Sequence, residues 1–258
     1  MFRPIRFVIR TIVLIKLMSL AFSAGMGMAY MLQLRQQYRT WGQVEGGDER
    51  DVRGDALVAE ADVVETRAVD IEATPEQVWP WLAQMGYGRG GWYSFSAVDR
   101  PWAPSGGPVG ESADEILPEF GDLAEGDLVP THPQGGFVAR TVEPNEAMVL
   151  FLDDTMMREQ ISELAADAAD TVEEQGGELE LDTDMDMDMD MPPYQVTLAF
   201  ELQELAGERT RLIERIRLHI EASEQQLRAR PFVAAGLFVF MRSQLQGIKR
   251  RAEGVEEA

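Results

Sequence analysis

Glu214 is the titratable residue whose setting most needs a chemical explanation. It lies within residues 211–221, where apolar and polar residues alternate as is typical of a half-buried strand. The face on which Glu214 falls is otherwise apolar and carries Leu212, Ile216, Leu218 and Ile220. An ionised carboxylate is costly to bury, so Glu214 must be paired with a cation, be protonated or border a cavity.

Arg140 is the cation that we expect to pair with Glu214. Its own strand, 136–142, places it with Val138 and Val142 on a face that is also apolar. Removing one member of a buried ion pair typically costs about 3–5 kcal/mol, because the other charge loses its partner. The pairing therefore predicts that Glu214→Leu and Arg140→Leu each destabilise the fold, and that the double substitution recovers much of the loss.

Arg89 stands among the glycines of residues 86–91 and is a second candidate for ligand contact. A guanidinium there suits an anionic headgroup or a carboxylate, although an ion pair with Asp99 or another acid is the simpler interpretation. Asp99 and Asp114 are suited to acid–base work, but no spacing in the sequence brings the two together.

Aromatic side chains accompany this glycine-rich stretch. Large flat rings beside permissive backbone are typical of the rim of a pocket, and equally of ordinary core packing. On the first interpretation, four aromatic residues are candidate ligand contacts: Trp79, Tyr87, Trp92 and Tyr93. The predicted ligand-binding set is completed by Arg89, Asp99, Arg140 and Glu214.

The composition excludes several chemistries. The chain has no Cys and only two His, which excludes disulfides, thiolate catalysis and zinc sites built on these residues. The sequence has no nucleophile elbow or phosphate-binding loop, and we expect neither a cofactor nor a metal. The net charge of −22 and the pI near 4.4 exclude non-specific binding of nucleic acid. Such acidity fits a protein hydrated in high salt, or one that is simply acidic.

Thr74 begins the helix on which the aromatic stretch depends. It is a predicted N-cap, with Pro75 at the first helical position and Gln77 completing a capping box, so a short helix is expected from there to about Met85. A second short helix is expected at 94–100. Strands are expected at 68–73, 127–132, 136–142, 147–153, 194–202 and 211–221, with a buried closing helix at 232–251.

Residues 154–192 interrupt this pattern. From Asp153 to Asp190 the chain has fifteen acidic residues and one basic residue, including an alternating Asp/Met tract. Carboxylates suit Ca²⁺, but the tract lacks the turn-forming Gly and the ligand spacing of a calcium loop. Because the segment has little aliphatic periodicity to offset its ordering entropy, it is predicted to be a disordered insertion.

Residues 1–39 predict a membrane anchor. The run from Ile12 to Leu34 is mainly apolar, carries no charge apart from Lys16 and is long enough to span a bilayer. More basic residues precede the run than follow it, which predicts a cytoplasmic N-terminus and a domain on the other side of the cell membrane. A cleaved leader ending near Ser23 is the alternative. Residues 40–64 are polar and are expected to form a stalk, or a strap lying on the domain.

The order of these segments resembles a known superfamily. The strand Ala68-Val-Asp-Ile-Glu-Ala, followed by Thr-Pro-Glu-Gln-Val-Trp-Pro-Trp-Leu, is similar to the opening of the START-like, SRPBCC superfamily of polyketide cyclases and lipid carriers. The runs 84–95 and 241–253 resemble a membrane-anchored branch of it. The resemblance implies an α+β helix-grip fold over 65–252, in which a curved antiparallel sheet wraps the long C-terminal helix, preceded by one transmembrane helix.

The same resemblance implies an apolar cavity between sheet and helix. The leading hypothesis is therefore a membrane-tethered domain that binds a lipid or another hydrophobic small molecule and catalyses no reaction. One alternative is an enzyme of the cyclase or dehydratase type, which would use polar groups of the cavity as general acid or base. The other is a structural membrane protein whose cavity is filled by its own side chains.

Overall fold

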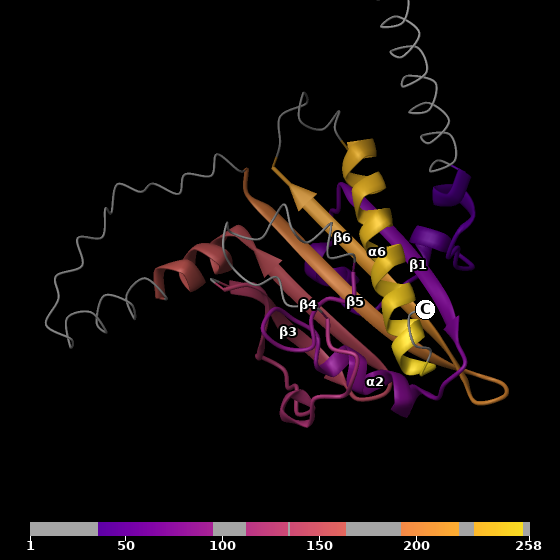
Figure 1. The fold of residues 1–258 in the computed structure, drawn as a ribbon. Helices are drawn as coiled ribbons and strands as arrows, with labels where there is room; N and C mark the ends of the chain where they lie inside the picture. The colour runs from indigo at the N-terminus through magenta and orange to yellow at the C-terminus, as the bar shows by residue number, and fades with distance from the viewer. Residues whose placement is uncertain (1–35, 95–111, 134, 164–191, 222–229, 255–258) are drawn as a thin grey trace, which may run out of the picture. The chain divides into compact units, whose positions relative to one another are not determined.

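Six antiparallel strands form one curved sheet, and the last helix of the chain lies along one face of it (Figure 1). This computed structural model describes residues 36–94, 112–133, 135–163, 192–221 and 230–254. The order of the strands across the sheet is β1-β6-β5-β4-β3-β2, so the first strand of the chain is an edge strand beside the last. The architecture is α+β, as the sequence predicts.

The expected strands are present, with small changes at their ends. Their bounds are β1 Val63–Ile71, β2 Leu128–His132, β3 Gly135–Glu143, β4 Ala147–Asp153, β5 Tyr194–Leu205 and β6 Arg209–Ile220. The main helices are α2 Pro75–Ala83 and α6 Arg230–Ala252, and the short 3-10 turns are η1 Gly47–Glu49, η2 Asp55–Val58 and η3 Pro118–Phe120. The capping box of α2 forms as expected, because Thr74 N–H donates to Oε1 of Gln77 at 2.9 Å.

The chain divides after Trp41 into two units. Of the first unit the structure describes residues 36–41, which are helical as far as Thr40. Residues 1–35 of the predicted anchor lie outside the described residues, as does most of the helix expected at 94–100. Within the described ranges, no helix combines the length and the apolar character needed to cross a bilayer.

Residues 154–163 are helical, where the sequence predicts the beginning of a disordered insertion. Met156 N–H donates to Oδ1 of Asp153 at 2.7 Å, which caps the first turn. Gln160 docks the helix on β3, because Gly136 N–H donates to its Oε1 at 2.8 Å and its Nε2 donates to the Gly136 carbonyl at 3.2 Å. The prediction of disorder is therefore wrong for these residues, whose backbone contacts offset the ordering cost. Residues 164–191 lie outside the described part.

The register of the sheet places Glu214 and Arg215 on opposite faces. Residues directly opposite on neighbouring strands point to the same face, and successive residues along a strand alternate. One row across the sheet is Arg67, Glu214, Phe200, Met148 and Val142; the adjacent row is Thr66, Arg215, Ala199, Val149 and Thr141. The first row faces α6, because the guanidinium carbon of Arg67 lies 5.3 Å from the ring centre of Phe238 in that helix.

One stripe of α6 packs onto this inner face. Its fully buried apolar residues recur at helical spacing and are Phe238, Met241, Leu245 and Ile248. The helix packs chiefly against β1 and α2. The sequence predicts that the first half of α6 is buried, but among residues 233–240 only Phe238 is buried. That prediction is wrong for the described side chains, because α6 meets the sheet along one stripe only.

Residues 42–62, which we call the strap, lie on the other face of the sheet. Val52 of the strap packs with Val149 and Ala199 of the outer row. Gly54 approaches the sheet so closely that a Cβ atom there would lie 2.4 Å from Cγ1 of Val149, and its φ of 87° also favours glycine. Of the two forms that the sequence leaves open for this segment, the strap is the one observed.

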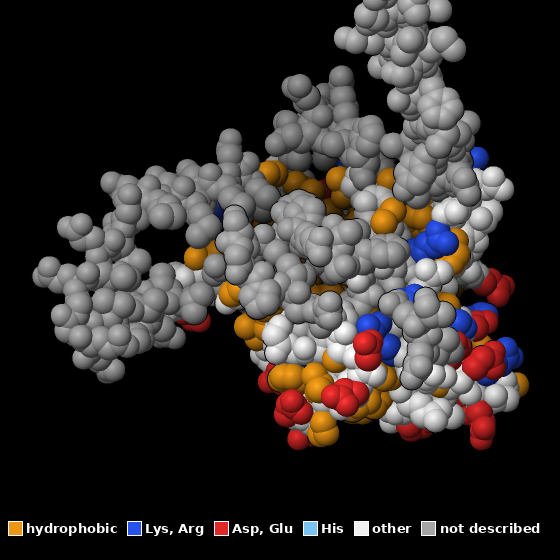
Figure 2. Space-filling model, in the orientation of Figure 1, with side chains coloured by type: hydrophobic (Ala, Val, Ile, Leu, Met, Phe, Trp, Pro, Cys, Tyr) orange, Lys and Arg blue, Asp and Glu red, His pale blue; other side chains and the backbone are white. Residues whose placement is uncertain are grey.

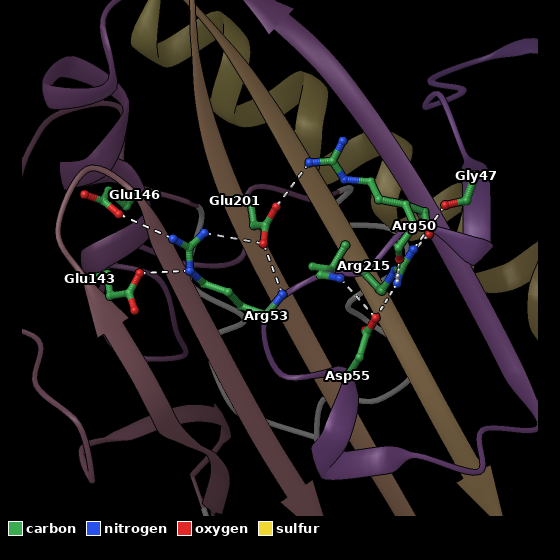
Figure 3. A network of polar contacts seen from close by, with 10 residues as sticks. Gly47, Arg50, Arg53, Asp55, Glu143, Glu146, Glu201 and Arg215 are labelled. Atoms are coloured by element: carbon green, nitrogen blue, oxygen red, sulfur yellow. Dashed lines mark hydrogen bonds and ion pairs between the residues drawn. The ribbon is translucent and has the colours of Figure 1, made fainter.

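Arg215 fastens the strap to the sheet (Figure 3). Its side chain is 1% exposed and donates to Oδ2 of Asp55 at 2.6 Å, to the carbonyls of Arg50 and Gly47, and to Oγ1 of Thr66. Beside it, Glu201 accepts a hydrogen bond from Arg53 N–H at 3.0 Å. The strap thus supplies acceptors for a buried cation and donors for a buried carboxylate.

The free energy of unfolding is expected to fall by about 2–4 kcal/mol in Arg215→Met, because Asp55 and the strap carbonyls lose their donor. Arg211→Met is the matched control on the same face of β6. Its pair with Asp70, 2.7 Å long, is half exposed, so its loss should cost less than about 1 kcal/mol. Urea unfolding measures both losses, and limited proteolysis should cut the strap faster in Arg215→Met alone. Equal losses would contradict this role for Arg215.

Gly247→Ala is expected to destabilise the protein by about 1–3 kcal/mol, although Ala favours helices. A Cβ atom at Gly247 would lie 2.1 Å from the carbonyl oxygen of Tyr93, where α6 presses on the loop after α2. Gly236 in the same helix is exposed and has no atom within 4 Å of such a Cβ, so Gly236→Ala should stabilise by up to about 1 kcal/mol. Thermal unfolding tests both; stabilisation by Gly247→Ala would show that the contact yields easily.

Candidate ligand-binding site

Glu214 lies on the sheet face that α6 covers, between Phe200 of β5 and Arg67 of β1. Its side chain is fully buried, and among the described residues neither carboxyl oxygen has a hydrogen-bond partner. Buried polar groups in folded proteins are nearly always hydrogen-bonded, since leaving one unsatisfied typically costs about 1–3 kcal/mol. An unsatisfied carboxyl in the sheet–helix layer is therefore the feature that most needs a functional explanation.

Burial raises the pKa of Glu214 well above its ordinary value of 4.5. The physical cause is the loss of hydration, which disfavours the ionised form, and no neighbouring cation opposes it. Glu214 is therefore held as a neutral carboxyl, which donates one hydrogen bond as well as accepting others.

Arg67 lies directly opposite Glu214 in β1 but is engaged elsewhere. Its Nη2 is 2.9 Å from Oε2 of Glu65, its Nη1 donates to the carbonyl of Thr66 at 2.8 Å, and its guanidinium stacks over Phe238. Arg67 and Glu65 are 4% and 2% exposed, so the pair is buried and its charges cancel within the layer. The sequence analysis missed both residues, although extending the alternation of Val69 and Ile71 backwards would have found them.

Arg140 does not pair with Glu214, and this prediction is wrong. Ala139 pairs with Leu150 and Thr141 with Val149, so Arg140 is the extra residue of a β-bulge in β3. Its exposed side chain lies with the guanidinium carbon 5.5 Å from the ring centre of Phe151. The bulge turns Arg140 away from the inner face, and a simple alternation cannot show this.

Arg89 clamps backbone segments together. Its Nη2 donates to the carbonyl of Ala83 at 2.8 Å and to that of Phe120 at 3.3 Å, and its guanidinium carbon lies 4.9 Å from the Phe120 ring centre. Partial burial lowers the pKa of Arg89. These contacts join the end of α2 to η3. The alternative partner considered for Arg89, Asp99, lies outside the described residues.

The aromatic candidates Tyr87 and Trp92 pin the loop after α2 to β2. Tyr87 N–H and Trp92 Nε1–H both donate to the carbonyl of Pro130, at 2.7 and 3.1 Å. The Trp92 ring also lies 6.0 Å from that of Phe137, centre to centre. Trp79 is 8% exposed and belongs to the core side of α2. These placements fit the packing interpretation of the aromatic residues.

Tyr93 is buried beneath α6 with its backbone in the left-handed region, at a φ of 56°. Its hydroxyl accepts a hydrogen bond from Nε2 of Gln84 at 2.9 Å, and its ring meets that of Trp81 edge-on at 6.0 Å. Burial raises the pKa of Tyr93 to about 12, so the hydroxyl stays protonated. Arg251 of α6 lies over the ring at 5.0 Å from its centre.

Gln244 of α6 is a second buried polar side chain that the sequence analysis missed. It is fully buried, and its Nε2 donates to the carbonyl of Trp92 at 2.9 Å, which fixes the orientation of the amide. Its Oε1 has no hydrogen-bond partner among the described residues. No sequence signal identifies this position, because an isolated Gln in a helix is most often exposed.

Acid–base and metal chemistry find little support in the described residues. Asp114 is exposed and pairs with Arg251 at 2.8 Å, and its proposed companion Asp99 lies outside the described ranges. Within those ranges, no three or more His, Asp or Glu side chains are grouped so as to hold a metal ion.

The surface charges on the side shown in Figure 2 are intermixed. Near the C-terminal end of α6, Lys249 lies 2.9 Å from Glu253, and Arg209 lies 3.8 Å from Glu72 of the neighbouring β1 end. Exposed pairs of this kind contribute roughly 0–1 kcal/mol each. These two pairs are locally balanced, and the inner face is the candidate site because Glu214 is unsatisfied there among the described residues.

Comparisons with known proteins identify no family: no family model and no curated protein matches the chain. Among solved structures, protein Ms6760 of Mycobacterium smegmatis is similar over 81% of this chain and 97% of its own, at 15% identity and a TM-score of 0.34. Protein MLL2253 of Mesorhizobium loti is similar over 72% of this chain and 98% of its own, at 15% identity and a TM-score of 0.31. The hypothetical protein jhp0584 of Helicobacter pylori is similar over 77% of this chain and 93% of its own, at 10% identity and a TM-score of 0.36. At TM-scores below 0.5, these similarities carry no argument about fold family or function.

The unsatisfied carboxyl predicts that Glu214→Leu stabilises the protein, by about 1–3 kcal/mol near pH 7, because it removes a buried polar group without a partner. This reverses the loss that the Arg140 pairing predicts. The matched control is Glu201→Leu in β5. The Glu201 carboxylate is also buried but is paired with Arg50 and Arg53, so this variant should be destabilised. Urea unfolding compares the two, and a large loss in Glu214→Leu would show a partner.

The stability difference between the wild type and Glu214→Gln is expected to depend on pH. An unfolded glutamate loses its proton near pH 4.5, whereas the raised pKa keeps the proton in the folded state. Above pH 4.5 the folded state therefore binds more protons, so the wild type should lose stability relative to the glutamine variant by up to about 1.4 kcal/mol per pH unit. The contribution is fully present below that pH. A difference that stays constant as the pH rises would contradict burial of an unpaired carboxyl.

Proposed function

We propose that this domain binds a hydrophobic small molecule or lipid between the sheet and α6. The observation that carries the proposal is the Glu214 carboxyl, which is enclosed in apolar surroundings with both oxygens unsatisfied. A bound molecule with one polar group would satisfy the carboxyl and let its apolar part occupy the same layer.

The side chains of this layer support the proposal. Three fully buried methionines belong to it: Met148 of β4, Met241 of α6, and Met85, whose Sδ lies 3.8 Å from Nε2 of Gln244. An unbranched thioether changes rotamer at low cost, so such a layer can rearrange around a guest. Along the first half of α6, the described side chains other than Phe238 are only partly buried, so this half of the helix encloses the layer incompletely.

The superfamily resemblance supports the same function. A curved antiparallel sheet with a long C-terminal helix is the arrangement that START-like proteins use, and we propose that this chain is a helix-grip member of that superfamily. In it, the space between sheet and helix is the usual position of the ligand. We further propose that residues 12–34 tether the domain to a membrane, so that a lipid ligand would be close at hand.

An enzyme of the cyclase or dehydratase type is the weaker candidate. General acid–base catalysis at such a site calls for at least two polar groups that converge on a substrate. Among the described residues, the neighbours of Glu214 in its row are Phe200 and the engaged Arg67. Binding therefore accounts for Glu214 with fewer assumptions than catalysis does.

The proposal is tested on the full chain purified in detergent. Organic extraction followed by mass spectrometry should recover one hydrophobic molecule in amounts comparable to the protein. Stripping that molecule should lower the unfolding temperature of the domain, and adding the extract back should restore it by roughly 5 °C or more. Lipid held only around a membrane anchor would be extracted without this shift. Absence of both the molecule and the shift would favour a layer filled by the protein's own side chains.

A further inference from the structure

The charge balance around Glu214 limits what kind of polar group a ligand can present. This inference rests on the proposed function, because it assumes that the layer holds a ligand. It adds the chemical class of that ligand. Glu214 is inaccessible to solvent, and both its oxygens lack partners among the described residues. Whatever satisfies them must therefore enter the layer between the sheet and α6.

The charged groups that face this layer are already neutralised. From β1 come Arg67 and Glu65, which pair with each other at 2.9 Å. From β5 and β4, the row presents only Phe200 and Met148. The buried stripe of α6 presents apolar side chains and the uncharged amide of Gln244. Two basic residues near the end of this helix, Lys249 and Arg251, are engaged with Glu253 and Asp114.

An anionic headgroup does not fit these surroundings. Its negative charge would lose its hydration in a layer whose guanidinium is already balanced by Glu65, and the protonated carboxyl of Glu214 offers it a single hydrogen bond and no opposite charge. The net charge of −22 on the chain opposes the approach of an anion as well.

A cationic headgroup does not fit either. A cationic headgroup would ionise Glu214, and both charges would lose their hydration in a low-dielectric layer. This desolvation cost is offset only when further hydrogen bonds satisfy both members of the pair. An ammonium has three donors. Among the described residues of this layer, the Glu214 carboxylate could accept from such a group, and Oε1 of Gln244 is a further buried acceptor without a hydrogen-bond partner.

We infer that the ligand is a neutral amphiphile whose polar group both donates and accepts hydrogen bonds, such as a long-chain alcohol or amide. A protonated carboxyl offers one donor and one acceptor, and a hydroxyl or an amide answers both without bringing a charge. Glu214 is then the residue that determines headgroup specificity, and the apolar layer holds the chain of the ligand.

The test uses the full chain in detergent, stripped of extractable lipid, and five probes with the same alkyl chain. These are dodecanol, dodecanamide, dodecane, dodecanoate and dodecylammonium. The affinity of each is measured by isothermal titration and by the shift in unfolding temperature, at a fixed ratio of probe to detergent. We expect dodecanol and dodecanamide to bind most tightly, by roughly tenfold or more over dodecane, because they alone satisfy the carboxyl without a charge.

Two variants assign the preference to Glu214. Glu214→Leu should reduce the affinities of the alcohol and the amide to that of dodecane. Glu214→Gln should keep them within a few-fold, because its side-chain amide is likewise a neutral donor and acceptor. Arg211→Met, on the outer face of the same strand, is the matched control and should leave all five affinities unchanged.

The outcomes separate this inference from the proposed function. If dodecylammonium bound most tightly of the five probes and lost this affinity in Glu214→Gln, the ligand would be cationic and the inference would be overturned. Dodecanol binding no tighter than dodecane, or no weaker in Glu214→Leu, would also overturn it while leaving a hydrophobic binding site in place. Absence of binding by every probe to the stripped wild type would remove the proposed function and the inference together.

Discussion

The register of β6 is the constraint on which the rest of the structure depends. Period-two alternation sends Arg215 to the outer face and Glu214 to the inner face, and a slip of one residue would exchange them. Each side chain is then buried by what covers its face, the strap for Arg215 and α6 for Glu214. The two outcomes differ because the strap brings acceptors to the cation, whereas the described residues of the inner layer bring no partner to the carboxyl.

The outer face shows how a buried charge is made stable in this fold. Asp55 and backbone carbonyls replace the hydration that the guanidinium of Arg215 loses on burial. This requires residues 42–62 to lie against the sheet, so the strap is part of the folded unit and not a free connector.

Sequence patterns predict the strands well because alternation is a local property. The capping box at Thr74 and the apolar faces of β5 and β6 have the same local origin. The site was predicted less completely. Arg140 was misplaced because a bulge shifts the alternation without a sequence mark. Arg67 was missed because β1 begins at Val63, before the strand expected from Ala68. Partners such as Gln160 and Gly136, or Gln244 and Trp92, are set by tertiary contacts that spacing does not encode.

The inner layer differs in charge from the chain as a whole. The chain carries a large negative charge overall, yet the described residues of the inner layer cancel theirs through the Glu65–Arg67 pair and a carboxyl that burial keeps protonated. A layer that is electrically neutral but not fully hydrogen-bonded distinguishes ligands by their donors and acceptors more than by their charge. Any partner of this layer therefore has to match one carboxyl group in an apolar setting, and the remaining selection falls to the length and shape of its hydrophobic part.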